Sequence, residues 1–551
     1  MSNSALFIFA LGVSAEFVTP LHAVGFLKIF SGTSNDTLTE ADIRTSLLSE
    51  IESDYGAFDT SSRISLMKEA LQPIFAALPK NKYGNLDRTA VRYALHRVFV
   101  MRHGWVIKGL SPHASPSNSS SKGVLKDKVP AYIEDLFEKR LHGKGLHLKE
   151  LAIVGATLEH LIHNEAVDKL GEVYEVHGFL PTDVISSDQA DQLLDTYMMG
   201  YIRSKSFKNM TLVEAKQLVG EMEVVYVAWG ETQKFVRGIR TSIAQNRVDF
   251  IAMSRVVGAV NERFGSFQDQ DCAEVKASLM RMEYSGSGRV KLADFYAPAR
   301  NGQWQFQESL PYLKQLGVID DFDRKNPSVM IPNYVASHAN CIATSGFYTI
   351  CCKNECEGIL GYLEQKIAAP EGKVGVIATL VANLSSSTVR APRELSANLL
   401  RRLDDIAMSH NGVVPLHGRL FAQWMHHAYP LECPFPHVAG TTSSLTADEW
   451  EIENGVVSVA SDEEMSQYVS RVSALAEEAK IDGGVAPWAF EEELLLGRTS
   501  SHGTTWSRVT SMPVSMRIVI LVIASASLLY SLAQSSRSRL VIGKDSDLKM
   551  V

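Results

Sequence analysis

Cysteine and histidine are the residue types in this sequence whose spacing most suggests chemistry. Five of the six cysteines lie between residues 341 and 433, and four histidines flank the last of them. Thiols and imidazoles form disulfides, bind zinc or copper, or carry out thiol redox reactions. The residues concerned are Cys272, Cys341, Cys351, Cys352, Cys356 and Cys433, with His417, His426, His427 and His437.

Three interpretations of these cysteines compete. In an oxidising compartment an even number of clustered cysteines predicts disulfides, and the adjacent Cys351 and Cys352 would then take different partners. This is the interpretation we favour, although the sequence leaves the connectivity open. A zinc or copper site is the second, but no C-x2-C spacing supports it. A redox thiol pair is the third, and its C-x-x-C spacing is also absent.

Other catalytic patterns are weak or missing. Glu159, His160 and His163 share one predicted helix, but the H-E-x-x-H zinc motif is not present, so histidines on a half-exposed helix are expected. The chain contains no G-x-S-x-G elbow, phosphate-binding loop or dinucleotide fingerprint. We therefore assign no catalytic residue and lean against an enzyme.

The stretch 268–296 has a helix–loop–helix outline. Val275, Leu279 and Met282 recur at helical spacing before a glycine-containing polar loop, and an apolar pattern resumes at Val290. The stretch resembles an EF-hand. With Glu283 at loop position one, Gly288 falls at position six, Val290 at eight and Asp294 at twelve.

The resemblance implies a candidate calcium site. Its ligands would be Glu283, Ser285, Ser287 and Asp294, with water completing the coordination. Serines replace carboxylates at positions three and five, and Lys291 stands at position nine. A hard cation needs several anionic oxygens, so calcium affinity is expected to be poor. No cofactor is assigned, and calcium is the one candidate.

Similar outlines occur at 79–101, 131–162 and 230–264. EF-hands pair through a short ladder between their loops, so the resemblance implies that Leu86 pairs with Leu148 and that Val248 pairs with Val290. Basic residues in these three loops oppose cation binding. They are Lys80, Lys82, Lys144 and Arg247.

Both ends of the sequence carry membrane-targeting signals. Residues 1–23 have the apolar segment and small-residue cleavage pattern of a signal peptide. Residues 514–533 reach the length of about 20 that a membrane helix needs. The basic tail that follows would be cytoplasmic. Four glycosylation sequons are compatible with a lumenal N-terminal portion. They are Asn35, Asn118, Asn209 and Asn383.

These features predict a mainly α fold with paired EF-hand-like helix–loop–helix units, a Cys/His-containing α-rich domain and one C-terminal transmembrane helix. The net charge of −8 does not suggest nucleic-acid binding. The predicted parts are a signal peptide (1–23), an EF-hand-like pair (37–170) with a Ser/Pro insertion (111–122), a helical segment with a second pair (171–300), the Cys/His domain (301–445), an acidic segment and stalk (446–511), the span (514–533) and a cytoplasmic tail (534–551).

The function expected is that of a single-pass membrane scaffold or interaction protein of the secretory pathway or cell surface. Its partners would be the membrane and an unidentified protein. A weakly calcium-binding, calcium-regulated protein is the first alternative. A lumenal metalloenzyme using the region from Cys341 to His437 is the second.

Overall fold

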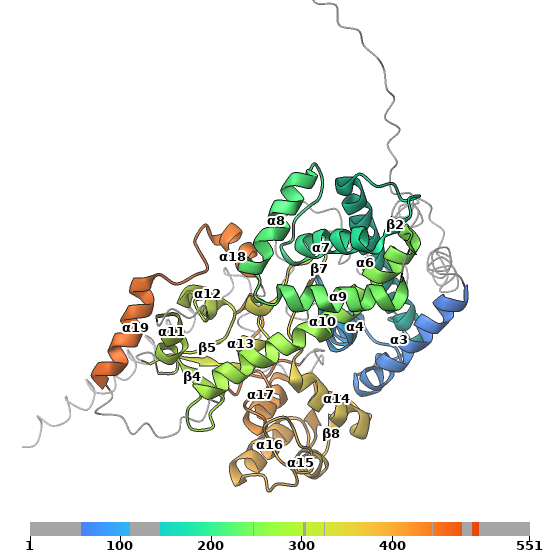
Figure 1. Cartoon of the computed structure of the whole chain (residues 1–551). Helices are drawn as coiled ribbons and strands as arrows, with labels where there is room; N and C mark the ends of the chain where they lie inside the picture. Colours follow the sequence, from blue (N-terminus) through green and yellow to red (C-terminus); the bar gives the residue numbers. More distant parts are fainter. Residues whose placement is uncertain are drawn as a thin grey trace, which may run out of the picture. The chain divides into compact units, whose positions relative to one another are not determined.

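The computed structural model describes residues 57–110, 144–245, 247–300, 305–323, 326–443, 445–475 and 488–494. Within these ranges the chain is mainly helical, as the sequence predicts (Figure 1). The first half contains α3 (Ala57–Ala77), α4 (Arg88–His103), α6 (Leu148–His177), α7 (Ser187–Ile202), α8 (Leu212–Val225), α9 (Trp229–Ile243) and α10 (Phe250–Arg281). The rest contains α11 (Leu292–Arg300), α12 (Leu310–Gln315), α13 (Ile331–Val335), α14 (Glu355–Ile367), α15 (Val374–Ala382), α16 (Ala397–Ser409), α17 (Arg419–Ala428), α18 (Ala447–Asn454) and α19 (Asp462–Leu475).

The strands are only two or three residues long and lie in the connections between helices. They are β1 (Trp105–Ile107), β2 (Ile185–Ser186), β3 (Arg247–Val248), β4 (Arg289–Lys291), β5 (Ile319–Asp320), β6 (Ser328–Met330), β7 (Tyr348–Ile350), β8 (Glu371–Gly372) and β9 (Val414–Pro415).

Four antiparallel pairings share one design, and we call them ladders one to four. Each pairing joins two extended segments that lead into a helix within a few residues. The central residue pairs are Leu86 with Leu146, Ile185 with Val248, Val290 with Val329, and Gly372 with Val414. The same arrangement of strand and helix therefore occurs four times in the described chain.

Local sequence explains why a helix begins directly after these strands. At the start of α7, Ser186 and Gln189 form a reciprocal capping box. At the start of α10, the Asp249 carboxylate accepts a hydrogen bond from the backbone N–H of Ala252 at 2.8 Å. These side chains satisfy backbone donors that the first helical turn leaves unpaired.

The ladders are embedded in three hydrophobic cores. Ladders one and two share the largest core, in which Leu86, Ile185 and Val248 are almost fully buried. Ladder three contributes Val290 and Val329 to a second core that includes Met465 of α19. Ladder four contributes Val414 to a third core with α16 and α17. Each ladder thus has a buried aliphatic side chain at its centre. This side chain packs in a core and so attaches the two helices that follow the ladder strands to that core.

Both predicted loop pairings are wrong. Leu86 pairs with Leu146 rather than Leu148, because α6 already begins at residue 148. Val248 pairs with Ile185, and Val290 pairs with Val329. The physical reason is the length of α10, whose 32 uninterrupted residues, followed by the loop 282–288, separate β3 from β4. At a rise of 1.5 Å per residue this helix holds its two ends about 48 Å apart.

Several predicted features lie outside the described residues. They are the signal peptide (1–23), the Ser/Pro insertion (111–122), Asn35, Asn118, the transmembrane segment (514–533) and the tail (534–551). Among the helices that the structure describes, none combines the length and apolar character needed to cross a membrane.

Candidate functional site

The six cysteines form three disulfides, which confirms the prediction that they pair. Cys272 of α10 is bonded to Cys352, Cys341 to Cys351, and Cys356 to Cys433. The adjacent Cys351 and Cys352 take different partners, as expected. In this state all six sulfurs are used in S–S bonds, so none is available as the thiolate that zinc or copper would need.

The four histidines near Cys433 each have a separate role. His417 Nε2 lies 2.7 Å from a carboxylate oxygen of Glu364, and His426 Nδ1 donates to the Cys433 carbonyl at 2.7 Å. His437 Nε2 donates to the Gly317 carbonyl at 2.6 Å, and the His427 ring stacks on Trp488. Their engagement with different elements gives no shared metal geometry. Burial lowers the pKa of His426 to about 3 and that of His427 to about 4.

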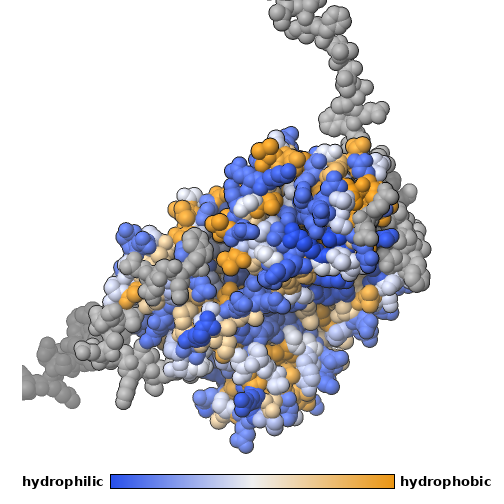
Figure 2. Space-filling view, in the orientation of Figure 1, coloured by the Kyte–Doolittle hydropathy of each residue, from blue (hydrophilic) through white to orange (hydrophobic). Residues whose placement is uncertain are grey.

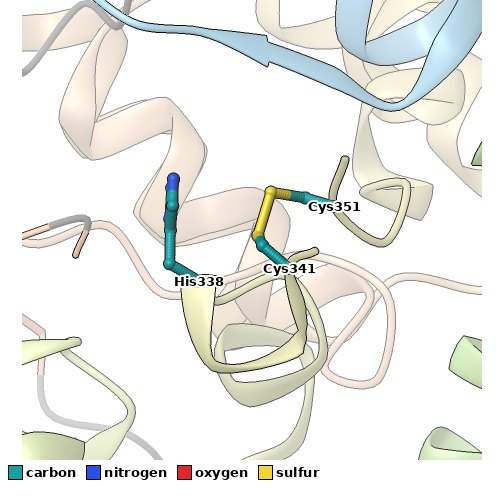
Figure 3. A group of neighbouring side chains, drawn as sticks. All are labelled: His338, Cys341 and Cys351. Atoms are coloured by element: carbon teal, nitrogen blue, oxygen red, sulfur yellow. A yellow bond between two sulfur atoms is a disulfide. The ribbon is translucent and has the colours of Figure 1, made fainter. Parts of the chain in front are cut away.

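A histidine that the sequence analysis did not single out lies beside one disulfide. His338, Cys341 and Cys351 form the one group of three metal-ligating side chains found among the described residues (Figure 3). Their ligand atoms all lie within 4.8 Å of one another. Burial lowers the pKa of His338 to about 4, so its imidazole is neutral at physiological pH. The H-x-x-C spacing in one short helical turn is the sequence signal that could have revealed this group.

In the loop that resembles an EF-hand, the predicted ligand at position one is turned onto its own backbone. The Glu283 carboxylate accepts hydrogen bonds from the N–H groups of Gly286, Ser287 and Gly288, at 3.3, 2.5 and 3.1 Å. The Ser287 hydroxyl donates to the Tyr284 carbonyl at 2.8 Å, and its oxygen lies 3.3 Å from the same carboxylate. Glu283 therefore already has three backbone donors as partners without an ion.

The other predicted ligands of this loop are placed as follows. Ser285 and Gly288 both have positive φ, 61° and 71°, as a tight turn requires. A side chain at Gly288 would also meet the Pro430 carbonyl, 2.2 Å from an added Cβ. Asp294 lies in the first turn of α11, where burial raises the pKa of its carboxyl. The turn therefore has the positive φ that an EF-hand loop needs at position six. Glu283, however, is hydrogen-bonded to the backbone of the loop, and burial favours the uncharged form of Asp294.

Basic side chains also make structural contacts, one at ladder one and one at ladder three itself. Lys80 Nζ donates to the carbonyls of Ala76 and Leu78, at 2.9 and 2.6 Å, and thereby caps α3. At ladder three, Arg289 Nε donates to the Asp320 carboxylate at 2.7 Å. In this ion pair Arg289 is buried and Asp320, the one carboxylate of β5, is partly buried.

Two of the four sequon asparagines lie within the described chain. Asn209 is exposed and has a positive φ of 64° in the connection before α8. Asn383 is exposed at the end of α15, where its Nδ2 donates to the Thr379 carbonyl at 2.8 Å. Both positions are accessible, as glycosylation would require.

The predicted Glu159 and His160 cluster is buried rather than half exposed. Glu159 accepts from His103 Nε2 at 3.0 Å, while His160 Nε2 and Asn164 lie 3.1 Å apart. Trp105 stacks on the His103 ring with centroids 4.1 Å apart. The His103–Glu159 contact joins the end of α4 to α6. Among the described residues, no third metal-ligating side chain lies close enough to complete a metal site here.

Exposed apolar side chains gather on α8 and directly after it. Val224, Val225 and Val227 expose 87%, 59% and 94% of their surface, and Val213 exposes 79%. Figure 2 shows hydrophobic residues over this region of an otherwise mainly hydrophilic face. Three of these valines lie within four residues at the end of α8, and clustered exposed apolar side chains are more typical of interaction sites than single ones.

Comparison with known proteins adds no further constraint. The chain matches no protein-family model, no curated protein and no solved structure.

Proposed function

We propose that this chain is a membrane-anchored scaffold or interaction protein of the secretory pathway or cell surface. In this proposal its ladders are degenerate EF-hand-like pairs that hold their form without calcium. The observation that carries the proposal is that Glu283, the predicted ligand at loop position one, already accepts backbone N–H groups of its own loop. Lys80 and Arg289 place positive charge at ladders one and three, which disfavours a cation there.

Two further observations support a constitutive scaffold. The three disulfides connect α10 to residue 352, residue 341 to residue 351, and α14 to residue 433, and such bonds are typical of oxidising compartments. The exposed valines of α8 offer apolar surface of the kind found at protein interfaces. The membrane anchor and lumenal orientation rest on the sequence signals at residues 1–23 and 514–533.

Calcium regulation is the second candidate, because Gly288 retains the positive φ of position six and Asp294 follows the strand at position twelve. Calcium binding would require Glu283 to exchange its three backbone hydrogen bonds for an ion. Of these two candidates we favour the calcium-independent scaffold.

Calorimetric titration of the purified full-length chain separates the two candidates. We expect no heat of binding up to millimolar Ca²⁺ and the same Tm with calcium or with a chelator. Heat that disappears in the Glu283→Gln variant would instead establish the calcium-regulated alternative. Glu274→Gln, which changes an acidic residue of α10, the helix that precedes the loop, is the matched control.

Protease protection tests the membrane part of the proposal. In sealed microsomes carrying the full chain with a C-terminal tag, we expect the tag to be digested and the ladder region to be protected. Digestion of both parts, or release of the chain by alkaline carbonate, would contradict an anchored lumenal protein.

A further inference from the structure

We propose that reduction of the Cys341–Cys351 disulfide creates, together with His338, a binding site for a zinc-type divalent ion. The disulfide form is a structural cross-link, and the dithiol form is the ligand set. This is an additional property of the region, independent of the scaffold role.

The backbone holds the two cysteines face to face whether or not the sulfurs are bonded. Ile342 and Ile350 exchange two N–H···O hydrogen bonds, at 2.8 and 2.9 Å. Because this pairing is antiparallel, the next residues outward, Cys341 and Cys351, lie directly opposite each other. Their Cα atoms are 4.2 Å apart.

Neighbouring contacts keep both cysteines in place after reduction. The N–H of Cys351 donates to the Gly104 carbonyl at 2.9 Å, and the adjacent Cys352 has its own disulfide to Cys272. On the other side, the N–H of Cys341 donates to the His338 carbonyl at 3.2 Å. The turn carrying His338 is anchored in addition by Asn340, whose Nδ2 donates to the Tyr334 carbonyl at 2.7 Å.

His338 supplies an imidazole that is still available. No side-chain hydrogen bond of this ring occurs among the described residues, whereas the four histidines near Cys433 have hydrogen bonds or ring-stacking contacts. The residue as a whole is partly exposed while its imidazole is largely enclosed, and the ring lies on the same side of the turn as the disulfide (Figure 3). Nearby Lys108 opposes a cation and nearby Glu449 favours one, but these two charges form an ion pair with each other.

The ligand set determines the class of ion. Two thiolates and one imidazole suit zinc, with Zn–S bonds near 2.3 Å, Zn–N bonds near 2.1 Å and a water in the fourth tetrahedral position. Two sulfurs on one zinc ion lie roughly 3.7 Å apart when the angle is tetrahedral. Small rotations of the cysteine side chains reach that separation from a broken disulfide, because the opposing backbones do not need to move.

The chemical steps balance as follows. A dithiol reductant gives two electrons and two protons to the disulfide, so the S–S bond breaks, two cysteine thiols form and the reductant becomes a cyclic disulfide. Zinc binding then releases the two thiol protons to solvent as two Zn–S bonds form.

Of the three disulfides, Cys341–Cys351 is the one best suited to reversible reduction and metal binding. It closes a loop of 10 residues, compared with separations of 80 and 77 for the other two, so its loss frees less chain. Cys341 is half-buried and gives a reductant access to the bond, although its partner Cys351 is buried. Cys356–Cys433 has the same pattern, and both cysteines of Cys272–Cys352 are buried, so it is the short loop and the neighbouring His338 that distinguish this disulfide. Within the described chain the other two disulfides have no third metal-ligating group beside them.

The test uses the full-length chain, limited dithiol treatment, anaerobic removal of the dithiol, and Zn²⁺ or Co²⁺ as the probe. We expect one ion per chain after reduction and none before. Bound Co²⁺ should show thiolate-to-metal charge transfer and tetrahedral visible bands. Peptide mapping after alkylation should show that Zn²⁺ protects Cys341 and Cys351 from the reagent in the unmodified sequence.

Variants make the assignment specific. His338→Ala should weaken Zn²⁺ binding at least ten-fold, and the Cys341→Ser/Cys351→Ser double variant should abolish it. His437→Ala is the matched control and should bind normally. The proposal is overturned if Zn²⁺ protects other cysteines, if His437→Ala loses the ion while His338→Ala keeps it, or if the reduced chain binds no ion. The alkylation readout needs no variant, so a misfolded mutant would not obscure the result.

Discussion

Arg97 of α4 and Glu364 of α14 form a buried ion pair although 267 residues separate them in the sequence. Their side chains are 1% and 0% exposed. His417 contacts the carboxylate oxygen of Glu364 that Arg97 also contacts, and Glu357 accepts a second hydrogen bond from the Arg97 guanidinium. This network joins the helix after Leu86 in ladder one to the helix before ladder four.

Removing Arg97 should destabilise the protein severely. The Arg97→Leu variant leaves the Glu364 carboxylate buried without its cation, and broken buried pairs typically cost about 3–5 kcal/mol. Chemical denaturation should reveal this loss. Lys234→Leu, which breaks an exposed ion pair with Glu231, should cost less than about 1 kcal/mol.

The double variant Arg97→Leu/Glu364→Leu distinguishes a charge effect from a packing effect. It should recover much of the stability lost in Arg97→Leu, because no buried charge is left unpaired. A double variant as unstable as the sum of the two single variants would contradict this account.

Glu364 should also make the stability of the protein fall in acid. Burial alone would raise the pKa of this carboxyl, but Arg97 and His417 outweigh burial and hold the pKa below its ordinary value. A carboxyl with a depressed pKa in the folded state contributes stability above its unfolded pKa, and this stability is lost as pH falls through the folded pKa. In Glu364→Gln the free energy of unfolding should vary less below pH 4 than in the unmodified chain.

His426 should add a second pH dependence at milder acidity. Its folded pKa of about 3 lies below the ordinary 6.5, so the unfolded chain binds a proton that the folded chain excludes. Stability from this group is complete above pH 6.5 and declines as pH falls toward 3. Between pH 7 and 5 the loss should be roughly 2 kcal/mol, since each pKa unit corresponds to about 1.4 kcal/mol.

His426→Asn keeps a hydrogen-bond donor near the Cys433 carbonyl but does not titrate. Its denaturation free energy should therefore change less between pH 7 and 5 than that of the unmodified protein. His410→Asn, at a half-buried histidine elsewhere in the chain, serves as the control and should leave most of the pH dependence intact. An unchanged pH profile in His426→Asn would show that other groups cause it.

The sequence predicts local features of this molecule better than long-range ones. The glycine turn at Gly288 and the pairing of clustered cysteines follow from residue type and spacing, which local chemistry controls. The partner of Val248 does not, because it depends on the uninterrupted length of α10. The Arg97–Glu364 pair gives no local signal at all, and the H-x-x-C spacing of His338 and Cys341 is only a weak one, because Cys351 joins the group through the fold.

The three disulfides should contribute unequally to stability. In the chain-entropy account, separations of 80 and 10 residues correspond to roughly 4.5 and 2.7 kcal/mol. Cys272→Ser/Cys352→Ser should therefore lower the Tm more than Cys341→Ser/Cys351→Ser. Thermal denaturation under non-reducing conditions makes the comparison. Equal Tm losses would mean that native-state contacts, rather than loop length, determine the contribution of each bond.

Gly265 is required by the close approach of α10 to the end of α4. An added Cβ would lie 1.9 Å from the His103 carbonyl oxygen, which is backbone and cannot rotate away. Gly265→Ala should therefore force the two helices apart and cost about 1–3 kcal/mol, as overpacking of a core typically does.

Gly238→Ala in α9 is the matched control, because nothing lies within 4 Å of its added Cβ. Alanine is the better helix former by about 1 kcal/mol, so the control should be stabilised while Gly265→Ala is destabilised. Equal behaviour of the two variants in urea denaturation would contradict the close contact between α4 and α10.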